Sequence, residues 1–199
     1  MRGYRVLAVL PLLALLSGLG GCGLSGTNEG GYIEGDGQVV TYALDKRDDP
    51  VSLTGKTLQG KPYDLARQRG KVVVVNVWGA WCNECIKEAP LLRAAYDQLK
   101  KKYGDKVAFL GIDVRDSSTA TPLAFERGND LTYPSLYSPD SAATQPFRDR
   151  MPNTTPATLV LDPQGRVAAV IGGAVPSELT LVDVVEDVLN GTKKGTKAS

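Results

Sequence analysis

The sequence contains no histidine, and this absence removes several common kinds of site from consideration. Without an imidazole the chain cannot build a Ser-His-Asp triad, a Cys-His pair, a histidine-ligated haem or the usual histidine-containing zinc site. An excess of charge of one sign is also lacking, because 23 Lys and Arg residues face 22 Asp and Glu residues, a formal net charge of +1. Since nucleic-acid-binding surfaces need a basic excess, we expect no nucleic acid as a partner.

The start of the chain has an apolar run, but the run is too short to span a membrane. It covers residues 6–16, is interrupted by Pro11 and follows the basic residues Arg2 and Arg5. Eleven helical residues rise about 16 Å, whereas the hydrocarbon core of a bilayer is about 30 Å thick. A charged start and a short apolar segment are typical of a secretory signal, so residues 1–21 are expected to be a signal peptide.

This segment ends in Leu19-Gly20-Gly21-Cys22, which resembles the lipobox of bacterial lipoproteins. In that motif a cysteine after small residues is lipidated and becomes the new N-terminus. The alternative is an ordinary signal peptide followed by a stray cysteine, but a lone exposed thiol is a liability in a secreted chain. We therefore expect lipidation of Cys22 and an extracytoplasmic protein that acyl chains anchor to the cell membrane.

The rest of the chain divides into three expected parts. Residues 22–44 are rich in glycine at first and are expected to form a flexible tether and an N-terminal extension. Residues 45–191 form the main domain, and residues 192–199 form a disordered tail. The composition, 42% hydrophobic and 23% charged, is that of a globular protein with a well-buried core.

The main domain alternates expected strands and helices. The apolar run over 71–78 indicates a central strand covered on both faces. After it, Ile86, Ala89, Leu92, Tyr96 and Leu99 recur at spacings of three and four, which predicts an amphipathic helix. Further extended segments are expected over 107–114, 133–137, 157–162 and 166–171, and further helices over 119–128, 142–150 and 177–191. In the last of these helices, one apolar face is expected to hold Leu179, Val182, Val185 and Leu189. This order predicts an α/β fold with a central mixed β-sheet flanked by helices, and strand-like pieces within 38–65 add an N-terminal β-hairpin extension.

The clearest chemistry stands where the strand over 71–78 gives way to the helix. Cys82 and Cys85 are three residues apart, so both sulfurs fall on one helical face, close enough to bond. The amides of a helix N-terminus carry partial positive charge and favour a thiolate at Cys82. This thiolate can attack a substrate disulfide and Cys85 can resolve the mixed disulfide, while Trp81 shields the pair with an apolar face.

A structural disulfide and a metal site are the alternatives for these two cysteines. A loop of three residues restrains little entropy of the unfolded chain. Two cysteines without a histidine supply too few metal ligands, unless a second chain completes the site. We therefore expect redox exchange, with the Cys82–Cys85 disulfide as the redox group, no other cofactor and no metal.

Residues 74–85, Val-Val-Asn-Val-Trp-Gly-Ala-Trp-Cys-Asn-Glu-Cys, together with Glu88-Ala89-Pro90, resemble the thioredoxin superfamily. The closest resemblance is to the membrane-tethered TlpA/ResA-like thiol-disulfide oxidoreductases of bacteria. Residues 153–162 are similar to the cis-proline loop of that family, and Gly172-Gly173 also matches. The resemblance covers about residues 50–190 and implies a thioredoxin-like fold.

The resemblance also implies a cis peptide bond between Thr155 and Pro156. In the family this loop lies opposite the dithiol and offers backbone groups to an extended substrate strand. The alternative is a trans proline that merely opens the next strand, since only about 5–6% of X–Pro bonds are cis.

Two positions differ from thioredoxin itself. Its buried aspartate is replaced by Asn76, which cannot carry a proton. ResA-like proteins have a glutamate at the position of Glu88, where it is linked to acid–base behaviour. A buried Glu88 would have a raised pKa and would shuttle protons for Cys85, whereas a solvated Glu88 would pair with Arg93 or Lys87.

By this resemblance, the expected function is a reductase in c-type cytochrome maturation. It would reduce the haem-binding disulfide of apocytochrome c with electrons from a membrane thiol-disulfide transporter. The nearest alternative is a general oxidase or isomerase of secreted proteins, because the direction of electron flow depends on a reduction potential that the sequence does not determine. A peroxiredoxin is less favoured, since Val75 and Gly79 stand where its motif has proline and threonine. A copper chaperone is also less favoured, because that class uses Cys-x-x-x-Cys with a distant histidine.

Overall fold

The computed structural model describes residues 31–33 and 39–191. The expected signal peptide, the lipidation site Cys22 and the expected tail over 192–199 lie outside the described residues. In the described part, no helix combines the length and the apolar character needed to cross a bilayer.

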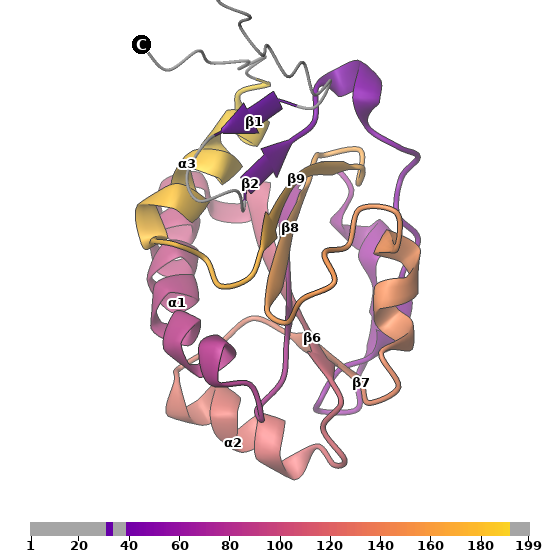
Figure 1. Cartoon of the computed structure of the whole chain (residues 1–199), viewed down its shortest axis with the longest axis vertical. Helices are drawn as coiled ribbons and strands as arrows, with labels where there is room; N and C mark the ends of the chain where they lie inside the picture. The colour runs from indigo at the N-terminus through magenta and orange to yellow at the C-terminus, as the bar shows by residue number, and fades with distance from the viewer. Residues whose placement is uncertain (1–30, 34–38, 192–199) are drawn as a thin grey trace, which may run out of the picture.

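A mixed seven-stranded sheet forms the centre of the described structure, with the strand order β1-β2-β9-β8-β5-β6-β7 (Figure 1). Its strands are β1 (Gly31–Ile33), β2 (Val39–Thr41), β5 (Val72–Trp78), β6 (Val107–Val114), β7 (Ser135–Ser138), β8 (Ala157–Leu161) and β9 (Val167–Gly172). The central strand β5 pairs in parallel with β6 and antiparallel with β8. The hairpin of β1 and β2 extends the sheet beside β9, and β3 (Thr54–Lys56) and β4 (Pro62–Asp64) form a separate small sheet. The predicted fold class is confirmed.

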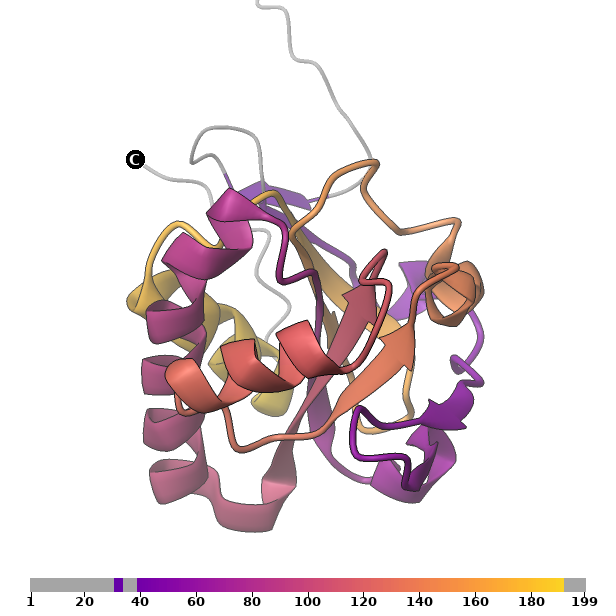
Figure 2. The same cartoon turned by 90° about the horizontal axis from the view of Figure 1, so that it is seen from below.

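Within the described residues, three α-helices and four short 3-10 helices complete the fold. The α-helices are α1 (Asn83–Tyr103), α2 (Ala120–Gly128) and α3 (Glu178–Leu189). The 3-10 helices are η1 (Leu44–Lys46), η2 (Leu65–Gln68), η3 (Gly104–Lys106) and η4 (Ala142–Phe147). Helices α1 and α3 lie side by side on one face of the sheet, and η4 lies on the other (Figures 1 and 2).

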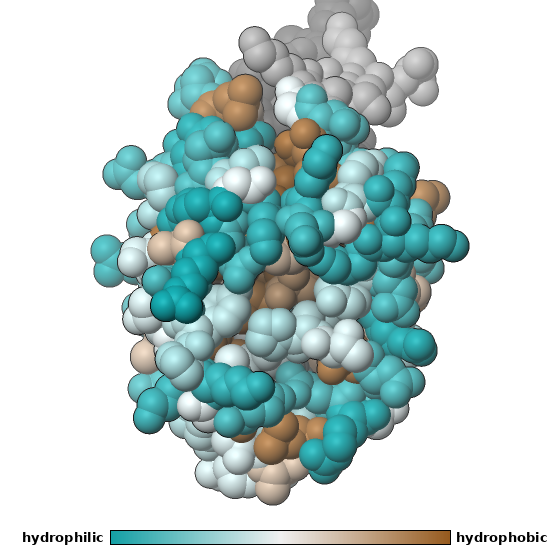
Figure 3. All heavy atoms as spheres, turned by 180° about the vertical axis from the view of Figure 1, so that it is seen from behind, coloured by the Kyte–Doolittle hydropathy of each residue, from teal (hydrophilic) through white to brown (hydrophobic). Residues whose placement is uncertain are grey.

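Two hydrophobic cores cover the two faces of the sheet. Val72 and Val74 of β5 pack in the core beneath α1 and α3, while Val73 and Val75 pack with Phe147 of η4 on the opposite face. All seven residues of β5 are buried. A strand that is covered on both faces needs apolar side chains on both, and this explains the nearly continuous apolar sequence of β5. The outer surface is mainly hydrophilic on the side shown in Figure 3, with hydrophobic groups confined to small areas.

Three details of the expected helices are wrong. Ile86 is 45% exposed, because Cys85 and Glu88 occupy the sheet-facing side of the first turns of α1. Leu179 is 65% exposed, and the buried side of α3 begins at Leu181 and Val182. The segment expected as a helix over 142–150 is the 3-10 helix η4, which ends at Phe147 and contains Pro146, a residue that lacks the N–H of an α-helical bond.

Candidate functional site

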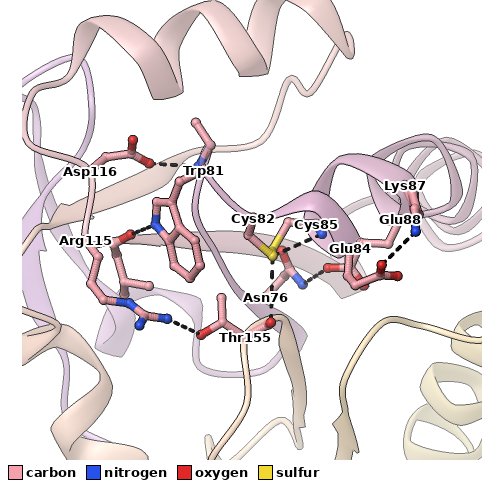
Figure 4. The surroundings of a disulfide bond; sticks show 12 residues. Asn76, Trp81, Cys82, Glu84, Cys85, Lys87, Glu88, Arg115, Asp116 and Thr155 are labelled. Carbon is pink, nitrogen blue, oxygen red and sulfur yellow. Dashed lines mark hydrogen bonds and ion pairs between the residues drawn. A yellow bond between two sulfur atoms is a disulfide. The ribbon is translucent and has the colours of Figure 1, made fainter.

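A disulfide joins Cys82 and Cys85 at the junction between β5 and α1 (Figure 4). The two Cα atoms are 5.2 Å apart, within the usual range for a disulfide. Cys82 is the N-cap of α1, and its Sγ accepts the backbone N–H of Cys85 at 3.2 Å. The same N–H, supported by the helix dipole, would stabilise a thiolate on Cys82 after reduction.

The loop before β8 lies directly against this disulfide. The peptide bond between Thr155 and Pro156 is cis, which confirms the expectation and excludes the trans alternative. The carbonyl oxygen of Thr155 is 3.7 Å from Cys82 Sγ. The structure thus brings Cys82 next to Thr155 and Pro156, although the cysteine is far from these two residues in the sequence.

Glu88 is buried, with an exposed fraction of 1%. Its Oε1 accepts a hydrogen bond from Asn76 Nδ2 at 2.9 Å (Figure 4). Its Oε2 accepts one from the backbone N–H of Val175, also at 2.9 Å. Burial raises the pKa of Glu88 to about 7, although these two hydrogen bonds act to lower it. Since Glu88 follows Cys85 by three residues on the buried side of α1, the structure places a titratable carboxyl on the same helix face as the second cysteine.

The alternative of a solvated Glu88 is not what the structure shows. Lys87 pairs instead with Glu84 at 2.7 Å. Arg93 lies within ion-pair distance of Asp97 and of another surface aspartate. Both basic residues are therefore engaged at the surface, away from the buried carboxyl.

Asn76 holds the Glu88 carboxyl in place. Its side chain is 2% exposed, and its Nδ2 donates both to Glu88 Oε1 and, at 3.1 Å, to Thr158 Oγ1. The asparagine thus supplies the donors that a buried aspartate could not supply. Because a carboxyl group has about four lone-pair sites, these contacts still leave Glu88 sites at which a proton can be held.

Trp81 covers one side of the disulfide region and is 46% exposed. Its indole Nε1 donates to the carbonyl of Val114 at 2.9 Å. Trp81 precedes Cys82 and Ile86 follows Cys85, and both are among the large hydrophobic side chains that are exposed in the described residues. Such a surface is suited to an apolar part of a partner protein.

Arg115 is a site residue that sequence reasoning missed. Its guanidinium lies 4.1 Å from the ring centroid of Trp81, and its Nη2 donates to Thr155 Oγ1 at 3.3 Å. The residue adopts a left-handed conformation with φ of 60°. A signal was available, because Arg115 directly follows β6, and the ends of parallel neighbouring strands lie at the same edge of a sheet.

A second buried carboxyl, also missed, lies on β6. Asp113 is fully buried, and burial together with the neighbouring Asp116 and Glu126 raises its pKa to about 8. Its strand neighbours across the sheet are Trp78 and Tyr137. Within the ranges that the structure covers, no three His, Cys, Asp or Glu side chains are grouped so that they could hold a metal ion.

Comparison with known proteins gives consistent matches. The model of the AhpC/TSA family matches residues 48–170. Among curated proteins, the thioredoxin-like protein YneN of Bacillus subtilis is 32% identical over 112 residues, which cover 55% of this chain and 61% of that protein. The thiol-disulfide oxidoreductase ResA of the same organism is 25% identical over 153 residues, 77% of this chain and 79% of ResA.

Two solved structures are similar over most of their own length. A DsbF homologue from Corynebacterium diphtheriae has a TM-score of 0.69 and 31% identity, covering 78% of this chain and 96% of that one. A secreted thiol-disulfide isomerase from Corynebacterium glutamicum has a TM-score of 0.72 and 29% identity, and the match covers 80% of this chain and 96% of that one.

Proposed function

We propose that this chain reduces disulfides of protein substrates outside the cytoplasm. The chain belongs to the AhpC/TSA family and is a thiol-disulfide oxidoreductase with a thioredoxin-like fold. The substrate that we favour is the haem-binding Cys-x-x-Cys disulfide of apocytochrome c, as the resemblance to ResA-like proteins implies. A membrane thiol-disulfide transporter supplies the electrons. Lipidation of Cys22 keeps the enzyme at the membrane, close to both partners.

The observation that carries this proposal is the position of Cys82, at the N-terminus of α1 and 3.7 Å from the Thr155 carbonyl. In the reduced enzyme, the Cys82 thiolate attacks one sulfur of the substrate disulfide. The substrate disulfide breaks, its second sulfur leaves as a thiolate that takes up a proton, and a mixed disulfide forms. The backbone beside Pro156 holds the substrate strand during this step.

The second step needs a base for Cys85. In its ionised form Glu88 takes the proton of the Cys85 thiol, and the Cys85 thiolate then attacks Cys82 Sγ. The mixed disulfide breaks, the first substrate sulfur leaves and is protonated, and the enzyme holds the Cys82–Cys85 disulfide. Two electrons have passed to the substrate. A pKa of about 7 suits this role, because both forms of Glu88 are then populated near neutral pH.

A trapping experiment tests the substrate. The Cys85→Ser enzyme cannot resolve the mixed disulfide, so the attached substrate stays on Cys82 and can be identified by mass spectrometry. A chain that also carries Cys82→Ser is the matched control and should trap nothing. A c-type apocytochrome as the main adduct is the expected result.

A general oxidase or isomerase is the second candidate, and the similarity to the secreted isomerase of Corynebacterium glutamicum favours it. In that case the trap would collect many unrelated secreted proteins. The equilibrium of the disulfide with glutathione separates the two further, because a reductase has a more negative potential than an oxidase.

A further inference from the structure

A groove of about 410 Å³ opens beside the disulfide, on the side of the cis-proline loop. Val77, Val114 and Arg115 line it from the ends of β5 and β6, and Met151, Pro152 and Thr155 line it from the loop before β8. Thr155 lines this groove, and its carbonyl oxygen is 3.7 Å from Cys82 Sγ, so the groove lies next to the residue that contacts the reacting sulfur. An extended polypeptide bound at the disulfide would therefore continue into the groove.

Arg115 is the one charged residue among the described residues that line the groove. Its guanidinium is held in position by the ring of Trp81 and by the hydrogen bond to Thr155 Oγ1. In the described part of the chain no carboxylate lies within 4 Å of it. A guanidinium carries five N–H donors and binds carboxylates in a two-pronged geometry, so Arg115 is able to receive one from a ligand.

The other charged groups near the disulfide are engaged with partners of their own. Glu84 and Lys87 neutralise each other at 2.7 Å. Asp116 is only 8% exposed, and its Oδ2 accepts the backbone N–H of Ala80 (Figure 4). The groove thus has apolar and neutral polar walls and one positive charge at its mouth.

We propose that Arg115 is a specificity-determining residue, which selects disulfides that have an Asp or Glu side chain next to the attacked cysteine pair. The substrate segment with this carboxylate occupies the groove, where the carboxylate accepts N–H donors of Arg115. This inference rests on the proposed function, because it concerns the substrate of the same disulfide.

Disulfide-bonded peptides with the pattern Cys-x-x-Cys test this selection. In one set the residue before the first cysteine is Asp, Asn or Lys, and in a second set the residue after the second cysteine is varied in the same way. The readout is the ratio of kcat/KM between the Asp and Asn peptides, with the enzyme recycled by dithiothreitol. An ion pair at such an exposed position is expected to give a preference of up to about fivefold for Asp in one of the sets. The preference should weaken at 0.5 M salt, because salt screens this attraction.

Variants of the enzyme separate charge from structure. Arg115→Met keeps an unbranched stem against Trp81 but lacks the charge, so the ratio should fall to about one; Arg115→Lys should restore part of it. The matched control is Arg67→Met, which removes an exposed cation from η2. Because η2 precedes β5 and the disulfide follows it, Arg67 lies at the opposite end of this strand from the disulfide. The control should therefore keep the wild-type ratio.

Each outcome has a separate meaning. If the wild-type enzyme reduces none of the peptides, the proposed function fails. If it reduces them all with a ratio near one in both sets, or if the preference survives in Arg115→Met, the role of Arg115 is refuted while the proposed function stands.

Discussion

Replacing Glu88 by glutamine should change how the stability of the protein depends on pH. Burial raises the pKa of this carboxyl from 4.5 to about 7 in the folded protein. Between these pH values the unfolded chain has released the proton while the folded protein keeps it. The folded state then binds more protons, so the free energy of unfolding falls as the pH rises. Each pKa unit corresponds to about 1.4 kcal/mol, and the whole loss from pH 4 to pH 8 is therefore about 3 kcal/mol.

The glutamine variant lacks this titration but fits the same space. The Oε1 of the glutamine can accept the N–H of Val175. If the Asn76 amide turns over, its Oδ1 can accept one hydrogen bond from the glutamine Nε2 and another from the Thr158 hydroxyl. Rearrangement of these hydrogen bonds costs about 1–2 kcal/mol and does not depend on pH. The informative quantity is therefore the change of the stability difference with pH, and not the difference at a single pH.

Urea unfolding of the oxidised protein at pH values from 4.5 to 8.5 measures this quantity. We expect the stability of Glu88→Gln relative to wild type to rise by about 3 kcal/mol over this range, since the contributions of all other groups cancel in the difference. The control is Glu84→Gln on the same helix, where the side chain is exposed, and its stability difference from wild type should not show this rise of about 3 kcal/mol. Parallel stability curves for Glu88→Gln and wild type would refute the argument that a buried carboxyl holds its proton near neutral pH.

Three further changes test the packing and charge described above. In Gly111→Ala the new Cβ would lie 2.7 Å from Trp78 Nε1 and closer still to Ser135 Oγ. The free energy of unfolding measured in urea should therefore fall by about 1–3 kcal/mol, and an unchanged value would mean that Trp78 and Ser135 can move away without cost. Because burial raises the pKa of Asp113 to about 8, thermal unfolding should show Asp113→Asn gaining stability relative to wild type between pH 4 and pH 8, and a constant difference would contradict the raised pKa. Ser177→Ala removes the side-chain cap of α3 and should lower the free energy of unfolding by about 1 kcal/mol, whereas Ser177→Asp, which can still cap, should not.

The sequence allowed the central strands and the reacting cysteines to be predicted because their signals are local. The run that forms β5 is apolar in each position but one, since helices and loops cover both faces of the sheet. Cys82 and Cys85 lie close for a reason that depends only on helical spacing. The contact between Cys82 and Thr155, in contrast, became predictable only through the family resemblance, because no local rule joins residues so far apart in the chain.

The features that were missed depend on how elements pack. Helical periodicity gives the relative directions of side chains but not which residues of the first turn are buried, and Ile86 and Leu179, both near the start of their helices, are exposed. The position of Arg115 directly after β6 was a signal that the sequence offered, but its contacts depend on a left-handed backbone conformation and on the nearby ring of Trp81. The burial of Glu88 was expected from the helical phase but could not be established from the sequence, because it involves the loop after β9, whose Val175 N–H donates to the carboxyl.

The N-terminal strands have a consequence for an enzyme that handles unfolded chains. An open β-sheet border can recruit any extended polypeptide through its free amides and carbonyls. Here β2 covers the edge of β9, so the outer strand at that border is the three-residue strand β1, and at the other border Thr57 forms a bridge with Leu136 of the short strand β7. Both borders of the described sheet thus end in short strands, which offer few backbone groups for pairing with another extended chain.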